Sequence, residues 1–130
     1  MEYICNLLDY LDNTYRRVPD KIAFADSQES VTFAALYRRT YAVASALREV
    51  GCTPNQPVAV LVERSVASVC AMLGVLRCGC YYAPIEAGTP APRLQKMLRQ
   101  LAPSAILCTG EMNTEDRFDM GCPVLSCHAC

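Results

Sequence analysis

The donor types of a zinc or redox site occur at four positions near the end of the printed sequence: Cys122, Cys127, His128 and Cys130. Thiolate and imidazole groups are the usual zinc ligands, and Cys127 with Cys130 has the C-x-x-C spacing of redox thiols. A structural zinc site usually takes ligand pairs from two separated knuckles, however, and a redox C-x-x-C normally opens a helix. We therefore interpret the cysteines as small apolar side chains, with a metal or redox tail as the alternative.

Other catalytic side-chain sets are missing from the sequence. His128 is the only histidine, so no Ser/His/Asp or Cys/His set is present. A phosphate-binding loop needs glycines close together, but the six glycines are scattered and match neither G-x-x-x-x-G-K nor G-x-G-x-x-G. Glu63 and Arg64 follow a predicted strand, and we interpret them as the start of a helix. The prediction is that this chain carries no catalytic, cofactor-binding or metal-binding residue.

The composition argues against a disordered chain, a nucleic-acid-binding protein and a membrane-spanning protein. The chain has 130 residues, of which 52% are hydrophobic and 19% charged, with a formal net charge of −1. This length is that of one ordinary domain, and the composition is not that of a disordered chain. Basic residues cluster only as pairs, which predicts no nucleic-acid partner and no membrane surface. No window is apolar enough to span a membrane and no signal peptide opens the sequence, so we expect a cytoplasmic protein.

The elements that would position any site begin with a helix, a small hairpin and a second helix. Apolar residues over 4–18 recur at helical spacing, and Pro19 ends that helix. Residues 21–33 contain two short apolar stretches around a polar turn, which predicts a hairpin. Thr32 can cap the second helix and Gly51 suits the left-handed position after it. Its inner face is predicted to consist of Leu36, Val43, Leu47 and Val50.

Strands and helices alternate from residue 58 onward. Strands are predicted at 58–62, 80–83, 105–108 and 123–126, and residues 109–121 are irregular. Ser65 is expected to cap the first intervening helix, which ends near Gly79, whereas Pro84 should stop the second strand. Thr89 followed by Pro90 is expected to start the next helix. This alternation predicts a three-layer α/β fold with a mostly parallel sheet and crossover helices.

Two stretches resemble core motifs of amino-acid adenylation domains. Residues 31–36 (V-T-F-A-A-L) resemble the first motif, L-[T/S]-Y-x-E-L. Residues 76–86 (L-R-C-G-C-Y-Y-A-P-I-E) resemble the second, L-K-A-G-x-A-Y-[V/L]-P-[L/I]-D. Thr89-Pro90 and Arg93-Leu94 are similar to the family's continuation, P-x-x-R-L. Outright matches in the second motif are Leu76, Gly79, Tyr82 and Pro84.

The resemblance implies the N-terminal segment of an AMP-forming, adenylate-making enzyme. Members of this superfamily, which includes nonribosomal peptide synthetase adenylation domains and D-alanine–carrier protein ligases, activate a carboxylate with ATP and Mg²⁺ and pass it to a thiol. The resemblance covers about residues 3–109, and the phosphate loop, the ribose-binding Asp and the catalytic Lys of the family lie beyond it. We therefore expect an incomplete N-terminal subdomain that binds no cofactor and is inactive alone.

Organisation and partners follow as further expectations. The chain divides into a helix–hairpin–helix unit at 1–56, a strand–helix unit at 57–108 and a tail at 109–130, all within one partial adenylation domain. The expected partners are the remainder of the enzyme and a carrier protein, and self-association is expected if apolar surface is left open. The alternative is a noncatalytic interaction module that complements a separately encoded remainder or binds a carrier protein.

The motif residues also have structural interpretations. Thr32 would form half of a capping box, because Ala35 stands where the motif has Glu, and the helix should be weaker at that end. Gly79 would end a helix with positive φ. Arg77 and Glu86 are interpreted as solvated ends of their elements.

Overall fold

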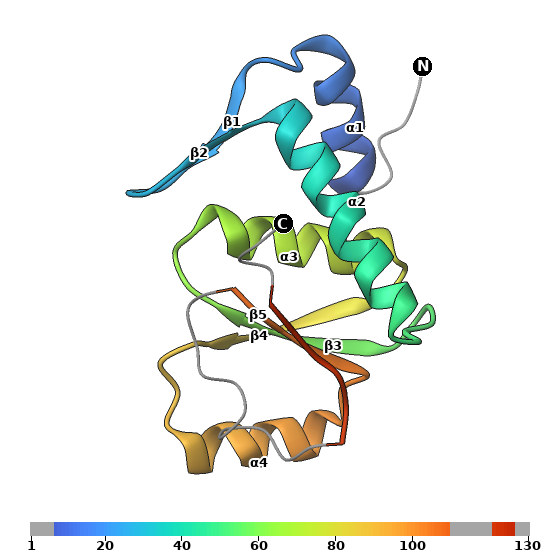
Figure 1. The fold of residues 1–130 in the computed structure, drawn as a ribbon, viewed down its shortest axis with the longest axis vertical. Coiled ribbons are helices and arrows are strands. Elements are labelled where there is room, and N and C mark those ends of the chain that lie inside the picture. Colours follow the sequence, from blue (N-terminus) through green and yellow to red (C-terminus); the bar gives the residue numbers. More distant parts are fainter. Residues whose placement is uncertain (1–6, 110–120, 127–130) are drawn as a thin grey trace.

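A computed structural model describes residues 7–109 and 121–126 of the chain (Figure 1). The sequence folds into helices and strands in the predicted order. Their bounds are α1 Leu7–Arg17, β1 Ile22–Ala25, β2 Ser30–Thr32, α2 Phe33–Glu49, β3 Pro57–Val62, α3 Val66–Arg77, β4 Tyr81–Glu86, α4 Ala91–Leu101, β5 Ala105–Cys108 and β6 Val124–Ser126.

A parallel sheet with strand order β4-β3-β5-β6 forms the centre of the molecule. The continuous apolar run Val58–Leu61 lies in β3, between two neighbours, and all four residues have 0% of their surface exposed. An apolar run without alternation is what a strand buried on both faces requires. The predicted strands at 58–62, 105–108 and 123–126 are confirmed.

Helices cover both faces of this sheet (Figure 1). On one face, Leu94 and Leu98 of α4 pack in a cluster with Leu61 and Ile106. On the other face, residues of α2 and α3 pack in a cluster with Val58, Val60 and Leu107. Because successive strand residues point to opposite faces, β3 and β5 supply both clusters. The predicted three-layer α/β architecture is confirmed.

The two helices on one face approach each other closely at Gly74. A Cβ atom built on Gly74 would lie 2.4 Å from Val43 Cβ and 3.1 Å from the Thr40 carbonyl oxygen. Only a residue without a side chain fits that distance, so Gly74 sets how tightly α3 packs on α2.

The N-terminal helix and the hairpin lie on the side of α2 and α3 that faces away from the sheet (Figure 1). Strands β1 and β2 pair in antiparallel fashion, as predicted. A third apolar cluster joins this region to the rest of the fold; its buried members are Leu11, Val31, Leu36, Val66, Cys70 and Leu73.

The predicted helix ends are confirmed at both long helices. Thr32 Oγ1 accepts the Ala35 N–H at 3.1 Å, and Ser65 Oγ accepts the Ser68 N–H at 3.1 Å. Gly51 and Gly79 follow the two helices with φ of +93° and +84°, where glycine is favoured.

Pro84 does not stop the second strand, contrary to the prediction. β4 continues through it to Glu86. Tyr81 donates its N–H to Gln56 O, just before β3, at 3.1 Å, and Ala87 donates its N–H to Val62 O, at the end of β3, at 3.1 Å. Along a strand, N–H groups point alternately to one side and to the other, and Pro84 is an odd number of residues from both Tyr81 and Ala87. An N–H at position 84 would therefore have pointed away from β3, toward the open edge of the sheet. Proline is tolerated at such edge positions.

Two smaller predictions about helix ends are also wrong. Pro90, not Thr89, is the N-cap residue of α4, with Pro92 within the first turn, so no side chain caps this helix. Val50 lies outside the buried face of α2 because it is the C-cap residue and is 36% exposed.

The interpretation of the cysteines as core residues is confirmed for Cys70, Cys78, Cys80 and Cys108, which are buried, as is Cys52. Among residues 7–109 and 121–126, no helix is long and apolar enough to cross a membrane.

Candidate functional site

The carboxyl ends of parallel strands are where open α/β sheets normally bind ligands. In this chain the ends of β3 and β4 border a shallow cavity of about 420 Å³. Glu63, Arg64 and Glu86 are exposed there, and Glu86 is a solvated end as predicted. Glu63 and Arg64, interpreted from the sequence as the start of a helix, lie just before the N-cap residue Ser65 of α3. The lining of the cavity is Val62, Glu63, Arg64, Glu86, Ala87 and Gly88.

A chain of buried hydroxyl groups fixes the same edge of the sheet. Thr109 Oγ1 donates to the Leu61 carbonyl oxygen at 2.7 Å and lies 3.0 Å from Ser68 Oγ. Because the Thr109 proton is used in this way, Ser68 donates to Thr109. Ser68 Oγ then accepts from the Glu63 N–H at 2.9 Å and from the Ser65 hydroxyl at 3.1 Å. These bonds join the end of β5 to the start of α3.

The start of α3 is also tied to the hairpin. Asp26 Oδ2 accepts the Val66 N–H at 2.8 Å, and Asp26 Oδ1 accepts the N–H groups of Gln28 and Glu29 at 2.7 and 2.8 Å. The Val66 bond, with those of Glu29 and Gln28 and the charge of Arg39, lowers the pKa of Asp26. Asp26 therefore holds a structural position as a carboxylate.

The hydrogen bonds at the starts of α3 and α4 bear on whether a phosphate group could bind there. An anion at a helix start needs free N–H groups. The N–H groups of Val66 and Ser68 at the start of α3 are already taken by Asp26 and Ser65. α4 has prolines at 90 and 92, which lack N–H groups. At the starts of these two helices, the N–H groups of Val66 and Ser68 are therefore already used, and residues 90 and 92 supply none.

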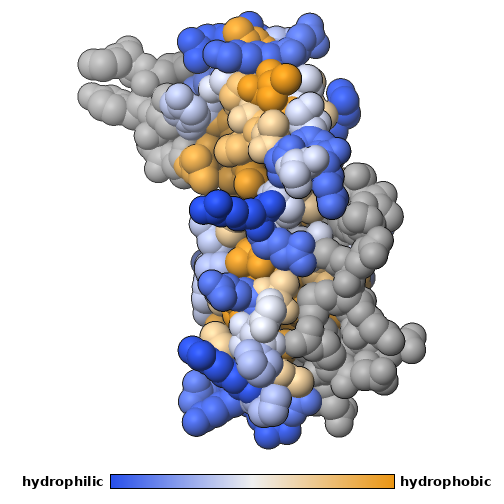
Figure 2. Space-filling model, turned by 90° about the vertical axis from the view of Figure 1, so that its left-hand side faces the viewer, coloured by the Kyte–Doolittle hydropathy of each residue, from blue (hydrophilic) through white to orange (hydrophobic). Residues whose placement is uncertain are grey.

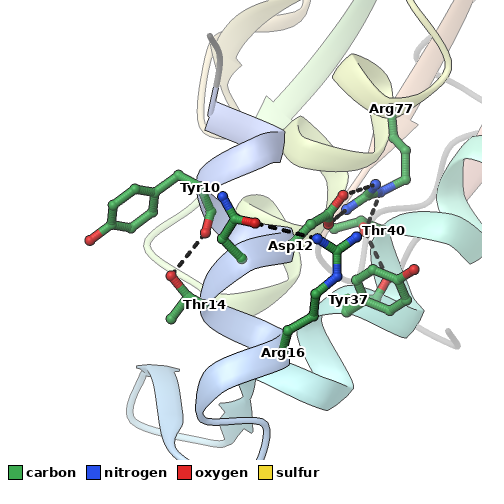
Figure 3. Close-up of polar contacts among 8 residues, drawn as sticks. Tyr10, Asp12, Thr14, Arg16, Tyr37, Thr40 and Arg77 are labelled. Atoms are coloured by element: carbon green, nitrogen blue, oxygen red, sulfur yellow. Dashed lines mark hydrogen bonds and ion pairs between the residues drawn. The ribbon is translucent and has the colours of Figure 1, made fainter. Parts of the chain in front are cut away.

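Arg77 is the largest departure from the sequence interpretation, which placed it as a solvated end. Its side chain is only 7% exposed and pairs with Asp12 of α1 (Figure 3). The guanidinium donates to both Asp12 carboxylate oxygens, at 2.7 and 3.3 Å, and to Thr40 Oγ1 at 2.9 Å. Burial alone would lower the pKa of Arg77, but the hydrogen bond and charge of Asp12 raise it above its ordinary value.

Aromatic rings complete the surroundings of Arg77. The guanidinium carbon lies 4.2 Å from the ring centre of Tyr41 and 5.2 Å from that of Tyr37, within the range of cation–π attraction. Tyr15 of α1 stacks on Tyr37 with ring centres 4.2 Å apart. Tyr37, Thr40 and Tyr41 have the i, i+3, i+4 spacing of one helix face, which is the signal that could have indicated a buried partner for Arg77.

An apolar groove lies between α1, β1 and α3. It has a volume of about 270 Å³, and Leu7, Tyr10 and Phe24 at its rim are 44–55% exposed. Figure 2 shows apolar residues gathered in the upper half of the molecule, the half that contains α1 and the hairpin in Figure 1. The groove is also lined by Leu11, Ala23, Phe33, Leu36, Val69, Met72, Leu73 and Tyr82.

The cysteine–histidine group has one member among the described residues. Cys122 is half-buried and packs against the cluster beneath α4. Cys127, His128 and Cys130 lie outside the described residues. Over residues 7–109 and 121–126, no group of three or more Cys, His, Asp or Glu side chains is arranged to hold a metal ion.

The sequence of the chain matches a family of known proteins. The AMP-binding enzyme family matches residues 11–128 of the chain. The chain belongs to this family. It corresponds to the N-terminal part of an adenylation domain, as the two sequence motifs predicted.

Curated relatives of this chain are very long synthetases. The chain is 31% identical over 114 residues to the hybrid PKS-NRPS synthetase thnA of Trichoderma harzianum, covering 87% of itself and 3% of that protein. It is 31% identical over 110 residues to gramicidin S synthase 2 of Brevibacillus brevis, covering 85% and 2%. The chain thus spans a small fraction of the relatives that it matches.

The solved structures that resemble this chain are also nonribosomal peptide synthetases. The nonribosomal peptide synthetase FmoA3, bound to α-methyl-L-serine-AMP, superposes with a TM-score of 0.88 at 28% identity, over 98% of this chain and 15% of that one. The AMPPNP-bound form of FmoA3 gives a TM-score of 0.87. The fold is therefore that of the N-terminal subdomain of an adenylation domain.

Proposed function

We propose that the chain is the N-terminal part of an ATP-dependent ligase that activates an amino acid for transfer to a carrier-protein thiol. The carboxylate would attack the α-phosphate of ATP to give an acyl adenylate and pyrophosphate. The thiol would then displace AMP, forming a thioester and releasing a proton. The observation that carries this proposal is the family match over residues 11–128, together with synthetase relatives at 31% identity.

We further propose that these 130 residues are inactive alone and bind neither ATP nor Mg²⁺. The support is geometric: Asp26 and Ser65 occupy N–H groups at the start of α3, and prolines occupy the start of α4. Chemistry would then come from the remainder of the enzyme, with the carrier protein as second partner. Since ATP and reduced thiols are cytoplasmic, we place the reaction in the cytoplasm.

A chimera tests the ligase assignment. Residues 7–109 would replace the matching segment of FmoA3, whose solved complex contains α-methyl-L-serine-AMP. We expect the chimera to catalyse ATP–pyrophosphate exchange with α-methyl-L-serine and to keep FmoA3's substrate preference, because selection and catalysis lie downstream. A folded chimera without exchange, or with a changed preference, would contradict the proposal.

A noncatalytic interaction module is the second candidate, and the apolar groove favours it. Leu7, Tyr10 and Phe24 expose apolar surface of the kind that a partner covers. Co-purification with a separate chain that begins at the phosphate loop would support this candidate. No association, combined with an active chimera, would favour the ligase alone.

A further inference from the structure

Helix α1 is attached to the fold by little buried surface. Only Leu11 and Thr14 of its 11 residues are buried, which is as few as in α4, whereas eight of the 12 residues of α3 are buried. α1 packs on α2 and α3, on the side away from the sheet (Figure 1). Elements with little buried apolar surface open at lower free energy than the core.

A polar contact holds the middle of α1. Asp12 accepts both hydrogen bonds from Arg77 at 2.7 and 3.3 Å (Figure 3). One turn later, Tyr15 stacks on Tyr37. Asp12 is itself 21% exposed, so water can replace Arg77 around its carboxylate.

Arg77 keeps other partners when α1 is removed. Thr40 Oγ1 and the rings of Tyr37 and Tyr41 all belong to α2. Release of α1 therefore leaves the guanidinium hydrogen-bonded and stacked. A buried charge without any partner would oppose release strongly, and the contacts with α2 reduce that penalty.

The chain just after α1 is fixed independently. Pro19 O accepts the Ala34 N–H at 2.9 Å, and Lys21 O accepts the Phe33 N–H at 3.0 Å. These bonds attach residues 19–21 to the start of α2. Movement of α1 can therefore take place about Val18, with the hairpin staying in place.

We propose that α1 is a strap that opens as a unit about Val18, with the Asp12–Arg77 pair as its latch. Leu7, Tyr10 and Leu11 of α1 line the apolar groove together with Leu36 and Leu73. Opening would uncover the apolar floor formed by Leu36 and Leu73, so the latch sets how much apolar surface the chain presents.

Hydrogen exchange followed by NMR tests the strap on the whole chain. We expect the amides of residues 11–17 to exchange about 10- to 100-fold faster than those in the middle of α3 and in β3. Exchange of residues 11–17 at the same rate as β3 would overturn the proposal, because α1 would then open only in global unfolding.

Two substitutions on α1 test the latch. Asp12→Asn should speed exchange of residues 11–17 by about a further tenfold, while β3 is unchanged. Arg16→Gln is the matched control, because Arg16 donates to Asn13 Oδ1 of the same helix at 3.4 Å, and it should leave exchange unchanged. Equal effects of the two variants, or faster exchange in β3 with Asp12→Asn, would overturn the latch.

Arg77→Lys examines the same contact from α3. Lysine keeps the charge but cannot donate to two carboxylate oxygens in the fixed geometry of a guanidinium. Exchange of residues 11–17 should again rise, and an unchanged rate would overturn the role assigned to Arg77.

Discussion

The central sheet and the α1–hairpin region are built on different principles. In the sheet, residues 58–61 of β3 are entirely buried, and helices pack on both faces. In the α1–hairpin region, Leu7, Tyr10, Ile22 and Phe24 are 44–57% exposed, and directed bonds from Asp12 and Asp26 hold the elements. The sheet is stabilised mainly by apolar burial, whereas the outer region combines a smaller apolar cluster with a few polar contacts.

The largest expected effect is the removal of a side chain from the sheet. Leu107 is 1% exposed and packs in the cluster between β3, β5, α2 and α3. Leu107→Ala should lower the free energy of unfolding by about 2–5 kcal/mol, measured by urea titration. Tyr10→Ala on α1 is the control and should change it by less than about 0.5 kcal/mol. Similar losses for both variants would remove the contrast between the regions.

The next effect tests the close approach of α2 and α3. Gly74→Ala places a Cβ 2.4 Å from Val43 Cβ and should cost about 1–3 kcal/mol of stability. Gly88→Ala is the matched control, because a Cβ there has no atom within 4 Å. If thermal unfolding shows no difference between the two variants, the helices do not pack as closely as described.

A pH titration tests the burial of the Cys80 side chain, just before β4. Burial first, and then neighbouring Cys78, raise the pKa of Cys80 from 9.0 to about 11. The folded state therefore holds the thiol proton of Cys80 more tightly than the unfolded state does. The stability that the protonated thiol contributes is present below pH 9 and is lost as the pH rises toward 11. Wild type should lose more stability than Cys80→Ala over this interval, and equal slopes in chemical denaturation would contradict the burial of Cys80.

The smallest effect concerns the hairpin. Asp26 has a pKa below its ordinary value of 3.8, so its contribution to stability is present above that pH and is lost as the pH falls through the lower folded value. Asp26→Asn should be less stable than wild type at pH 7, and the difference should shrink at low pH. A constant difference from pH 7 to pH 2 would show that the charge is not what joins Asp26 to Val66.

Local signals made most of the fold predictable. The apolar runs of β3 and β5, the caps at Thr32 and Ser65, and the glycines after α2 and α3 each act within a few residues. The two family motifs also lie in contiguous segments, and they led to the family that the comparisons establish.

The features that the sequence does not predict depend on contacts between residues far apart in the chain. The sequence predicts a strand end at Pro84, because a sequence does not show which side of β4 lacks a neighbour. It predicts a solvated Arg77, because the partners Thr40 and Asp12 lie 37 and 65 residues away. The apolar groove likewise needs α1, β1 and α3 to come together. The prediction that the chain carries no catalytic residue stays a prediction.

The most direct test of the functional account is amino-acid-dependent ATP–pyrophosphate exchange by the isolated 130-residue chain. The full FmoA3 protein, run with its amino acid, would be the positive control. The account predicts exchange no higher than the rate without protein for any of the 20 common amino acids or D-alanine. Exchange that rises in proportion to the concentration of the isolated chain would contradict it.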